Sequence, residues 1–317
     1  MPKICGMTVA LGKLFLLRHM SSNIEVYDTN TLTRENDLLA KIFGLPRDIA
    51  ACATNRYCYI SERNTGFLRR VGFHVVDTSM HSTRVELLEE QHKQWKVDGC
   101  PNGLSVTPAL NVLVACDDDR TLKEYDSDGN HLRLVLLPAD MDRPHHAICL
   151  LPSCDVFLVC HGGWSSTTPR ACVVRCTTTD AGGSNGHLIT MTGSVDVKEV
   201  YGGIPGSEVG QLMVPLRLAM AMMITPLAQA KGQQRNIFVV DFKNFRVVLL
   251  RMSINVATSE CSLSYDSCLL APGTDGKQFS PERLCLDEAG RKLYVSDDNN
   301  LVTFSRKDGD DLWELTA

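Results

Sequence analysis

The sequence has no apolar run long enough to cross a bilayer, and it contains few aromatic residues. Its longest apolar stretch covers residues 218–224, whereas a membrane-spanning helix needs about 20 residues. Aromatic residues make up only 6% of the 317 residues, so few rings are available to stack on nucleic-acid bases. The net charge of −5 also opposes electrostatic capture of polyanions. We therefore expect no membrane partner and no DNA partner.

The usual marks of secretion and of zinc binding are also missing. No Asn-x-Ser/Thr glycosylation acceptor and no Cys-x-x-Cys pair occurs, and residues 1–20 lack the cleavage site of a secretion signal. The thirteen cysteines are an odd number, which favours free thiols in a reducing compartment over a disulfide framework. We expect a cytoplasmic protein whose cysteines pack as small hydrophobic residues.

Motifs of common enzymes are absent too. The chain has no Gly-x-Ser-x-Gly elbow, no phosphate-binding loop and no His-Glu-x-x-His helix. One stretch gathers metal-ligating residue types, namely His145, His146, Cys149, Cys154, Cys160 and His161. These residues fall on two predicted neighbouring strands, where successive side chains point to opposite faces. We therefore predict ordinary strand packing there, no metal site, no cofactor and no catalytic residue.

What the sequence does contain is a repeat. Five prolines each precede a short apolar strand, a turn, a second strand, an acidic or Asn-rich turn and a third strand. These prolines are Pro46, Pro101, Pro144, Pro215 and Pro281. Residues 7–28 show the same order of strands without a well-placed proline. The motif therefore occurs six times, with no helix between copies.

A unit of about 40 to 45 residues is the size of a four-stranded propeller blade. We predict an all-β fold, a single six-bladed β-propeller of four-stranded antiparallel blades. The expected blades cover residues 1–43, 44–98, 99–142, 143–212, 213–278 and 279–317. Two β-sandwiches in tandem would share the strand alternation but would not explain one motif occurring six times.

Three insertions enlarge the repeat, at residues 72–91, 177–193 and 222–234. Long insertions are where such scaffolds vary their partners. The stretch 84–90 has the spacing of a short helical turn, but an amphipathic loop packed on its own blade is the favoured interpretation.

Two junctions resemble the NHL repeat, a β-propeller family found in tripartite-motif proteins. A Gly-rich segment precedes a proline at residues 202–212 and again at 273–280, and residues 241–246 match the family's Asp-x-x-Asn-x-Arg turn. A second turn keeps Asp297 and Asn300 but has Val302 in place of the arginine. Asp and Asn lock such turns by bonding nearby backbone N–H groups, so we predict a structural role for Asp241 and Asn244.

The resemblance implies three classes of function. Most members are expected to bind proteins, some to read single-stranded RNA on a positive face, and one branch to hold a metal-dependent lyase site in the channel. A lyase needs several histidines that converge on one metal, and a lactonase-type hydrolase needs converging oxygen ligands. The positions two residues after each proline, expected near the channel mouth, are instead Asp48, Gly103, His146, Arg217 and Arg283.

The predicted binding surface is an Arg/His patch at the channel mouth. It consists of Arg47, His145, His146, Arg217 and Arg283, together with Trp164 in a nearby loop. Arg guanidinium groups suit phosphate geometry. We expect Arg217→Glu combined with Arg283→Glu to abolish anion binding and to leave stability nearly unchanged.

The sequence as a whole predicts a non-catalytic interaction scaffold that binds a protein partner through this mouth. Single-stranded RNA bound by the same patch is the alternative, and a metal-dependent lyase or hydrolase in the channel is a third. Any ubiquitin-ligase role would need an effector domain that the sequence given does not contain.

Overall fold

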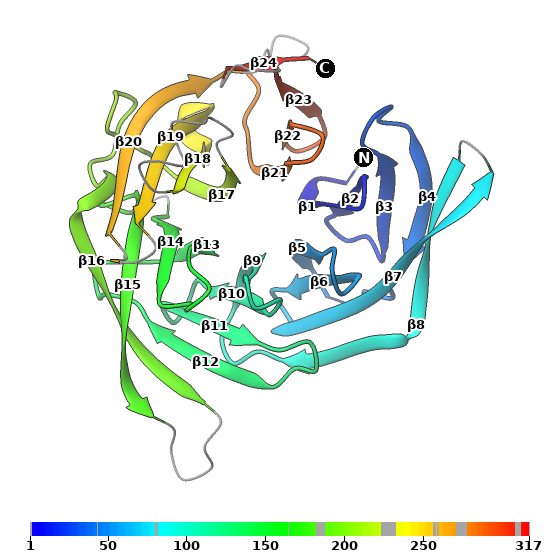
Figure 1. Cartoon of the computed structure of the whole chain (residues 1–317), viewed down its shortest axis with the longest axis horizontal. Helices are drawn as coiled ribbons and strands as arrows, with labels where there is room; N and C mark the ends of the chain where they lie inside the picture. Colours follow the sequence, from blue (N-terminus) through cyan, green and yellow to red (C-terminus); the bar gives the residue numbers. More distant parts are fainter. Residues whose placement is uncertain are drawn as a thin grey trace.

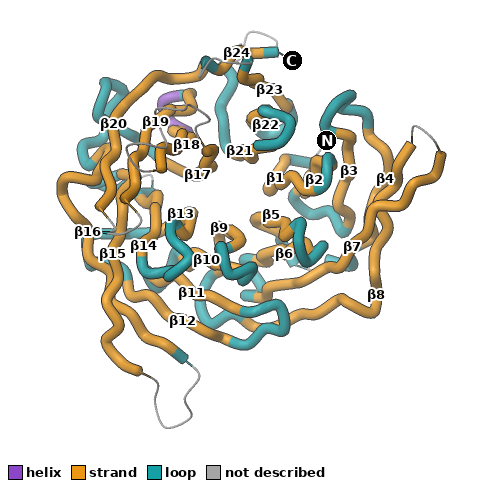
Figure 2. Tube along the Cα trace, in the orientation of Figure 1, coloured by secondary structure: helices purple, strands orange, loops and turns teal. Residues whose placement is uncertain are grey.

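The computed structural model describes residues 2–42, 44–79, 82–163, 165–181, 188–222, 233–255, 258, 260–270, 278–307 and 312–316. The described chain is mostly strand, joined by loops and turns, and the short 3-10 helix η1 (Phe242–Asn244) is its one helical segment (Figure 2). No helix in these ranges has the length and apolar character needed to cross a membrane.

The strands form four sheets of four strands and one sheet of eight. The first sheet contains β1 (Ile4–Ala10), β2 (Lys13–Arg18), β3 (Asn23–Asp28) and β4 (Arg34–Leu39). The second contains β5 (Pro46–Cys52), β6 (Tyr57–Glu62), β7 (Phe67–Ser79) and β8 (Ser82–Lys96).

The eight-stranded sheet is built from two runs of consecutive strands. The first run is β9 (Pro101–Val106), β10 (Val112–Cys116), β11 (Thr121–Tyr125) and β12 (His131–Leu136). The second run is β13 (Pro144–Cys149), β14 (Val156–His161), β15 (Arg170–Ala181) and β16 (Ile189–Gly202).

The two remaining sheets complete the chain. One contains β17 (Pro215–Met222), β18 (Gln233–Asp241), β19 (Arg246–Asn255) and β20 (Glu260–Leu269). The other contains β21 (Arg283–Asp287), β22 (Lys292–Ser296), β23 (Leu301–Arg306) and β24 (Trp313–Leu315).

The sheets are arranged around a central axis like the blades of a propeller (Figure 1). Strands β1, β5, β9, β13, β17 and β21 lie innermost, and each contacts the next around the ring, with β21 contacting β1. Buried apolar side chains fill the spaces between neighbouring sheets. The all-β, propeller-like prediction is therefore confirmed.

The expected six separate antiparallel blades are not found, because one junction is joined by backbone pairing. Strand β16 runs parallel to β12, with Arg133 opposite Ile189 and Leu136 opposite Thr192. This pairing merges two runs of four strands into the eight-stranded sheet. The far half of the β15–β16 hairpin thus covers the outer edge of β12, which would otherwise present unpaired N–H and C=O groups.

The expected insertion at residues 72–91 is a β-hairpin, and the stretch 84–90 lies in strand β8, so neither a helical turn nor a loop forms there. Phe73 and Val85 are buried against the core of the first sheet, with the Phe73 ring 5.0 Å from that of Phe15. Burial against a neighbouring sheet explains why these residues remain extended. Of the other two insertions, residues 182–187 and 223–232 lie outside the described residues.

The ring closes through backbone and side-chain hydrogen bonds and through packing between the first and last sheets. Ile4 N–H donates to the Asp298 carbonyl at 2.7 Å, and Tyr294 Oη donates to the Thr29 carbonyl at 3.0 Å. A shared apolar cluster that includes Ile4 and Tyr294 fills the junction. All strands of the first sheet come from residues 4–39 and all strands of the last from residues 283–315, so neither sheet borrows a strand from the other.

Asp241 and Asn244 lock the turn between β18 and β19, as predicted. Asp241 accepts hydrogen bonds from Met213 N–H at 2.9 Å, from Asn244 Nδ2 at 2.7 Å and from Arg246 Nε at 3.0 Å. Asp297 accepts similarly from the Asn300 N–H at 2.7 Å. The other Gly-rich segment quoted for the resemblance, at 273–280, lies mostly outside the described residues.

All thirteen cysteines have free thiols. Nine of them are buried, among them Cys160 and Cys172 in strands β14 and β15. Their packing among apolar neighbours fits the expectation that they act as small hydrophobic residues.

Candidate functional site

Proline begins four of the inner strands, and a β-bulge follows each of these prolines. In β5, β13 and β17 the register shifts directly after the proline, so that the next residue is the unpaired one. These unpaired residues are Arg47, His145 and Leu216. A bulge leaves one residue outside the ladder and re-aims its side chain. In β9 the extra residue lies between Pro101 and Leu104.

The re-aimed side chains surround one end of the ring axis. A cavity of about 280 Å³ opens there, and its lining includes Arg47, His145, Leu216 and Glu282, each of which directly follows a proline. Lys3 also lines it and follows Pro2. The sequence prediction overlooked Pro2, whose spacing from Pro46 matches the repeat and would have identified Lys3.

The rest of the lining comes mainly from loops that follow second strands or precede inner strands. The loop residues are Arg63, Asp117, Arg143, Gly163 and Val214, and the lining is completed by Phe242 in η1 and by Arg283, the first residue of β21. Because neighbouring strands are antiparallel, the start of each inner strand and the end of the next strand meet at this same end of the ring. We call this cavity the mouth.

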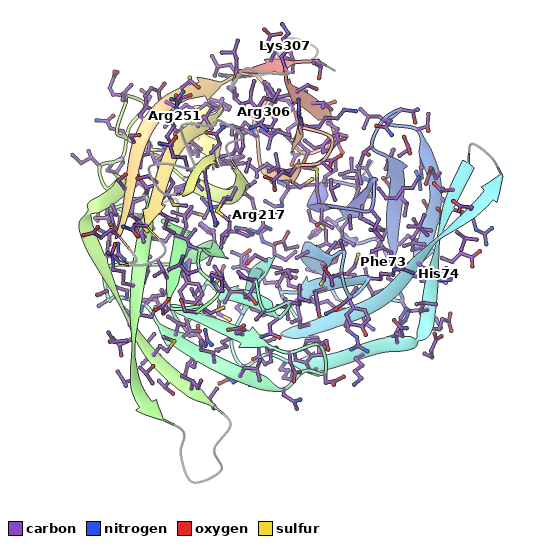
Figure 3. The ribbon with its side chains drawn as sticks, viewed as in Figure 1. Phe73, His74, Arg217, Arg251, Arg306 and Lys307 are labelled. Atoms are coloured by element: carbon purple, nitrogen blue, oxygen red, sulfur yellow. The ribbon has the colours of Figure 1, made fainter. Side chains whose placement is uncertain are left out.

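The residues two positions after the prolines lie deeper, in the wall of the ring. Arg217 is 4% exposed and Asp48 is 4% exposed, and their atoms Nη1 and Oδ2 are 2.8 Å apart. Asp48 Oδ2 also accepts the Leu104 N–H at 2.7 Å. This buried ion pair joins β5, β9 and β17 across the axis. Figure 3 labels Arg217 near the centre of the ring.

Gly103 makes room for this arrangement. A Cβ atom on Gly103 would lie 2.2 Å from the His145 carbonyl oxygen and 2.7 Å from Arg217 Nη1. Both distances are shorter than van der Waals contact, and the first involves backbone. Glycine at this position therefore lets β9, β13 and the Arg217 side chain approach one another.

Arg283 is the second arginine of the wall. It is 3% exposed, and its Nε donates to the Cys5 carbonyl at 2.6 Å while Nη1 donates to the Glu282 carbonyl at 2.9 Å. Arg283 also belongs to the lining of the mouth. We call Arg217 and Arg283 the wall arginines, and Arg47 and Arg143 the mouth arginines.

The structure therefore divides the predicted patch. Arg47, His145 and Arg283 line the mouth, whereas Arg217 and His146 are not part of its lining. Trp164 lies outside the described residues. Arg143, absent from the prediction, lines the mouth and is exposed. With both wall arginines buried and engaged, the expectation that replacing them leaves stability unchanged no longer holds.

A hydrogen-bond chain fixes Arg47 and His145. His145 Nε2 lies 3.2 Å from the Gly162 carbonyl oxygen, which can only accept, so Nε2 carries the proton. His145 Nδ1 must then accept from Asn102 Nδ2 at 3.1 Å. Asn102 Oδ1 is left to accept from Arg47 Nε at 2.9 Å. The chain therefore determines both the tautomer of His145 and the orientation of the Arg47 guanidinium.

Burial and the neighbouring cations keep the histidines neutral. Burial, and then the Arg47 guanidinium, lowers the pKa of His145 to about 3. Burial, and then Arg217, lowers the pKa of His146 to about 3. His146 Nε2 donates to the Leu104 carbonyl at 2.9 Å. Both rings are thus hydrogen-bonding groups without charge near pH 7.

Burial and the neighbouring positive charges also shift the pKa values of the arginines. Burial, and then Arg283 and Arg217, lowers the pKa of Arg47 to about 10. Burial lowers the pKa of Arg217 to about 10 against the opposing effect of Asp48. Burial also raises the pKa of Asp48, while Arg217 opposes that rise. An anion placed in the mouth would relieve the repulsion that Arg47 experiences.

Cations outnumber carboxylates in the mouth. Five of its lining side chains are Lys or Arg and two are Asp or Glu. Lys3 pairs with Glu282, and Arg63 pairs with Asp117 at 3.0 Å. Among the described residues, Arg47 and Arg143 have no carboxylate within 4 Å, and Arg283 Nη1 lies 4.0 Å from Glu282 Oε2. The mouth is therefore a cationic hollow in an acidic protein.

The described residues contain no group of three His, Cys, Asp or Glu side chains that could hold a metal ion. Within the predicted cluster, the Cys149 thiol donates to the Leu151 carbonyl at 3.1 Å. His161 accepts from Arg170 Nε at 2.8 Å through its Nε2. These side chains are thus used within the local packing.

Comparison with known proteins identifies the fold of this chain but assigns it to no family. No protein-family model matches the sequence, and no curated protein is detectably similar to it. Hydrazine synthase from Kuenenia stuttgartiensis is similar in structure, with a TM-score of 0.55 at 14% identity over 98% of this chain and 97% of that one.

Two further structures show the same arrangement. A protein from Lactobacillus plantarum has a TM-score of 0.55 at 11% identity, covering 99% of this chain and 84% of that one. A catalytically inactive virginiamycin B lyase from Staphylococcus aureus, determined with quinupristin, has a TM-score of 0.51 at 12% identity, covering 99% and 83%. Identities this low show a shared β-propeller fold alone.

Proposed function

We propose that this chain is a non-catalytic interaction module that binds a protein partner through the mouth, by means of an acidic group that enters the cavity. The observation that carries the proposal is that Arg47 and Arg143 line one hollow and have no carboxylate partner among the described residues. Guanidinium forks bind carboxylate and phosphate oxygens in a directional way. An acidic side chain of a partner would supply the missing counter-charge.

The scaffold for this role, in our proposal, is a six-bladed NHL-like propeller in a cytoplasmic protein. Counting the eight-stranded sheet as two joined blades gives six units of four strands, and the turn formed by Asp241 and Asn244 supports the NHL resemblance. Thirteen free thiols support a reducing compartment.

Single-stranded RNA is the runner-up ligand. A phosphodiester is also an anion, but affinity for RNA normally needs aromatic platforms for its bases. Phe242 is the one aromatic residue among the described residues of the mouth lining. A channel enzyme is not proposed, because both ring nitrogens of His145 and the Nε2 of His146 are already hydrogen-bonded to backbone or amide groups.

Fluorescence anisotropy with two labelled probes tests the proposal. A Glu-rich peptide and a random single-stranded RNA pool are titrated with the full chain at ~50 and ~200 mM salt, since ionic binding weakens across that range. We expect salt-sensitive peptide binding that Arg47→Glu combined with Arg143→Glu removes. Arg56→Glu is the control, because Arg56 is exposed in the turn between β5 and β6, at the opposite end of β5 from Arg47.

Each result decides between the candidates. Tighter binding of the RNA pool, lost in the same double variant, would replace the protein partner with RNA. An absence of salt-sensitive binding by either probe would contradict an anion-binding mouth.

A further inference from the structure

The mouth has a more specific chemical preference than an acidic group in general. We infer that it takes a phosphate monoester, as on a phosphorylated serine or threonine of the partner protein. This inference rests on the proposed function and names the ligand class of the same site. It follows from the number of unopposed cations, the donors they leave free and the shape of the hollow.

The first argument concerns charge. Arg47, Arg143 and Arg283 line the mouth without a carboxylate in hydrogen-bonding distance among the described residues. A carboxylate or a phosphodiester brings one negative charge, whereas a phosphate monoester brings about −1.5 to −2 at pH 7. Clusters of arginines are the usual means of recognising phosphorylated segments. A phosphate monoester therefore neutralises the charge of these three arginines better than a singly charged anion does.

The second argument concerns the free N–H donors. Arg47 uses Nε on Asn102, which leaves both of its terminal amino groups available. Arg283 uses Nε and Nη1 on backbone carbonyls, which leaves Nη2. Arg143 makes no hydrogen bond with any described residue and is exposed. The three oxygens of a phosphate monoester can accept from the guanidinium forks of Arg47 and Arg143 and from Arg283 Nη2, whereas a carboxylate has two oxygens.

The third argument concerns preorganisation. The chain from Gly162 through His145 and Asn102 holds the Arg47 guanidinium in place before any ligand arrives. The backbone carbonyls of Cys5 and Glu282 hold Arg283 in the same way. A site whose donors are already oriented loses little side-chain freedom when the anion binds.

The fourth argument concerns access. The mouth is a hollow of about 280 Å³ at one end of the ring axis. A phosphate at the tip of a side chain can enter such a hollow from one direction. A phosphodiester carries chain on both sides, so it can only lie across the opening. This difference favours a phosphorylated protein over single-stranded RNA.

Nitrogen–proton NMR titration of the full chain tests the inference, with the arginine Nε–Hε signals as the readout. The probes are a blocked Gly–phosphoserine–Gly tripeptide, the same tripeptide with glutamate, and dimethyl phosphate as the diester. We expect the phosphoserine probe to bind tightest and its affinity to rise about fourfold from about pH 5.5 to about pH 7.5, because the second phosphate pKa is about 6. His145, with its pKa lowered to about 3, stays neutral throughout.

Matched variants locate the binding. Arg143→Gln should weaken binding of the phosphoserine probe about tenfold, because one hydrogen bond to a charged group is lost. Arg56→Gln should leave it unchanged. Both residues are exposed arginines with positive φ, 47° for Arg143 and 56° for Arg56, so the two substitutions carry the same backbone cost.

The outcomes separate this inference from the proposed function. Equal binding of the glutamate and phosphoserine probes, without a pH effect, would overturn the phosphate assignment and leave an anion-binding mouth. Tightest binding of dimethyl phosphate would overturn it in favour of a diester such as RNA. Binding of none of the probes at the mouth arginines would contradict both proposals.

Discussion

The wall arginines and the mouth arginines lie at the same end of the ring, yet their surroundings differ. Arg217 is buried against Asp48, and Arg283 is buried against two backbone carbonyls. Arg143 is exposed, and among the described residues the Arg47 guanidinium bonds only the amide of Asn102. Charge alone therefore does not reveal the role of an arginine here. What distinguishes the two groups is how far the guanidinium is buried and how many of its donors are already used within the fold.

The largest effect should come from breaking the buried pair in the wall. Arg217→Met leaves Asp48 as an uncompensated buried carboxylate, and we expect it to lower the free energy of unfolding by about 3 to 5 kcal/mol. Urea denaturation measures this loss. Arg143→Met is the matched control at the mouth and should change stability by less than about 0.5 kcal/mol.

A double variant checks the cause of that loss. Asn in place of Asp48 can still accept the Leu104 N–H, so Asp48→Asn combined with Arg217→Met should recover part of the stability. Equal stability of the Arg217→Met and Arg143→Met proteins would remove the distinction between wall and mouth.

Glycine substitutions sharpen the same comparison with a smaller effect. Gly103→Ala would place a Cβ atom 2.2 Å from the His145 carbonyl oxygen, and we expect a loss of about 1 to 3 kcal/mol from the forced backbone shift. Gly163→Ala, at the mouth, would meet only the flexible Arg143 side chain, at 3.1 Å from its Cδ. Thermal unfolding of both variants measures the difference. If Gly103→Ala proved as stable as Gly163→Ala, the close packing of the wall would be contradicted.

A further effect should appear in the pH dependence of stability. The pKa of His145 is lowered to about 3 in the folded protein from a usual value of 6.5, so the unfolded chain takes up the proton first as the pH falls. His145 therefore contributes stability above pH 6.5 that is lost as the pH drops, by about 2 kcal/mol between pH 7 and pH 5.

His145→Gln isolates this contribution, because Gln can still donate to the Gly162 carbonyl but does not titrate. Denaturation across this pH range should show a shallower loss of stability for the variant. Identical pH profiles for the variant and the unaltered protein would contradict a neutral, buried His145.

The sequence predicted where the inner strands begin, because proline at a strand start has a physical cause. Proline has no N–H to donate, so it suits the first residue of a strand, and Pro46, Pro101, Pro144 and Pro215 each begin one. The prediction took the residue two after each proline as the one at the mouth. The bulge in β17 reverses this choice, since it turns Leu216 toward the cavity and returns Arg217 to the ladder.

The outer strands were harder to predict, because their partners lie in a neighbouring sheet. Residues 84–90 contain charged and apolar residues at a spacing that also fits a helix, and it is the burial of Val85 next to the first sheet that favours the strand. The parallel pairing of β12 with β16 joins residues more than fifty positions apart, and no local pattern encodes such a contact.

That parallel pairing also has a consequence for biosynthesis. During translation, β12 leaves the ribosome well before β16, so its outer edge has no partner while the intervening residues are being made. An unpaired edge is the part of a nascent β protein most open to wrong pairing. The run of strands β9 to β12 can therefore reach its final form only after Thr192, which pairs with Leu136, has been synthesised.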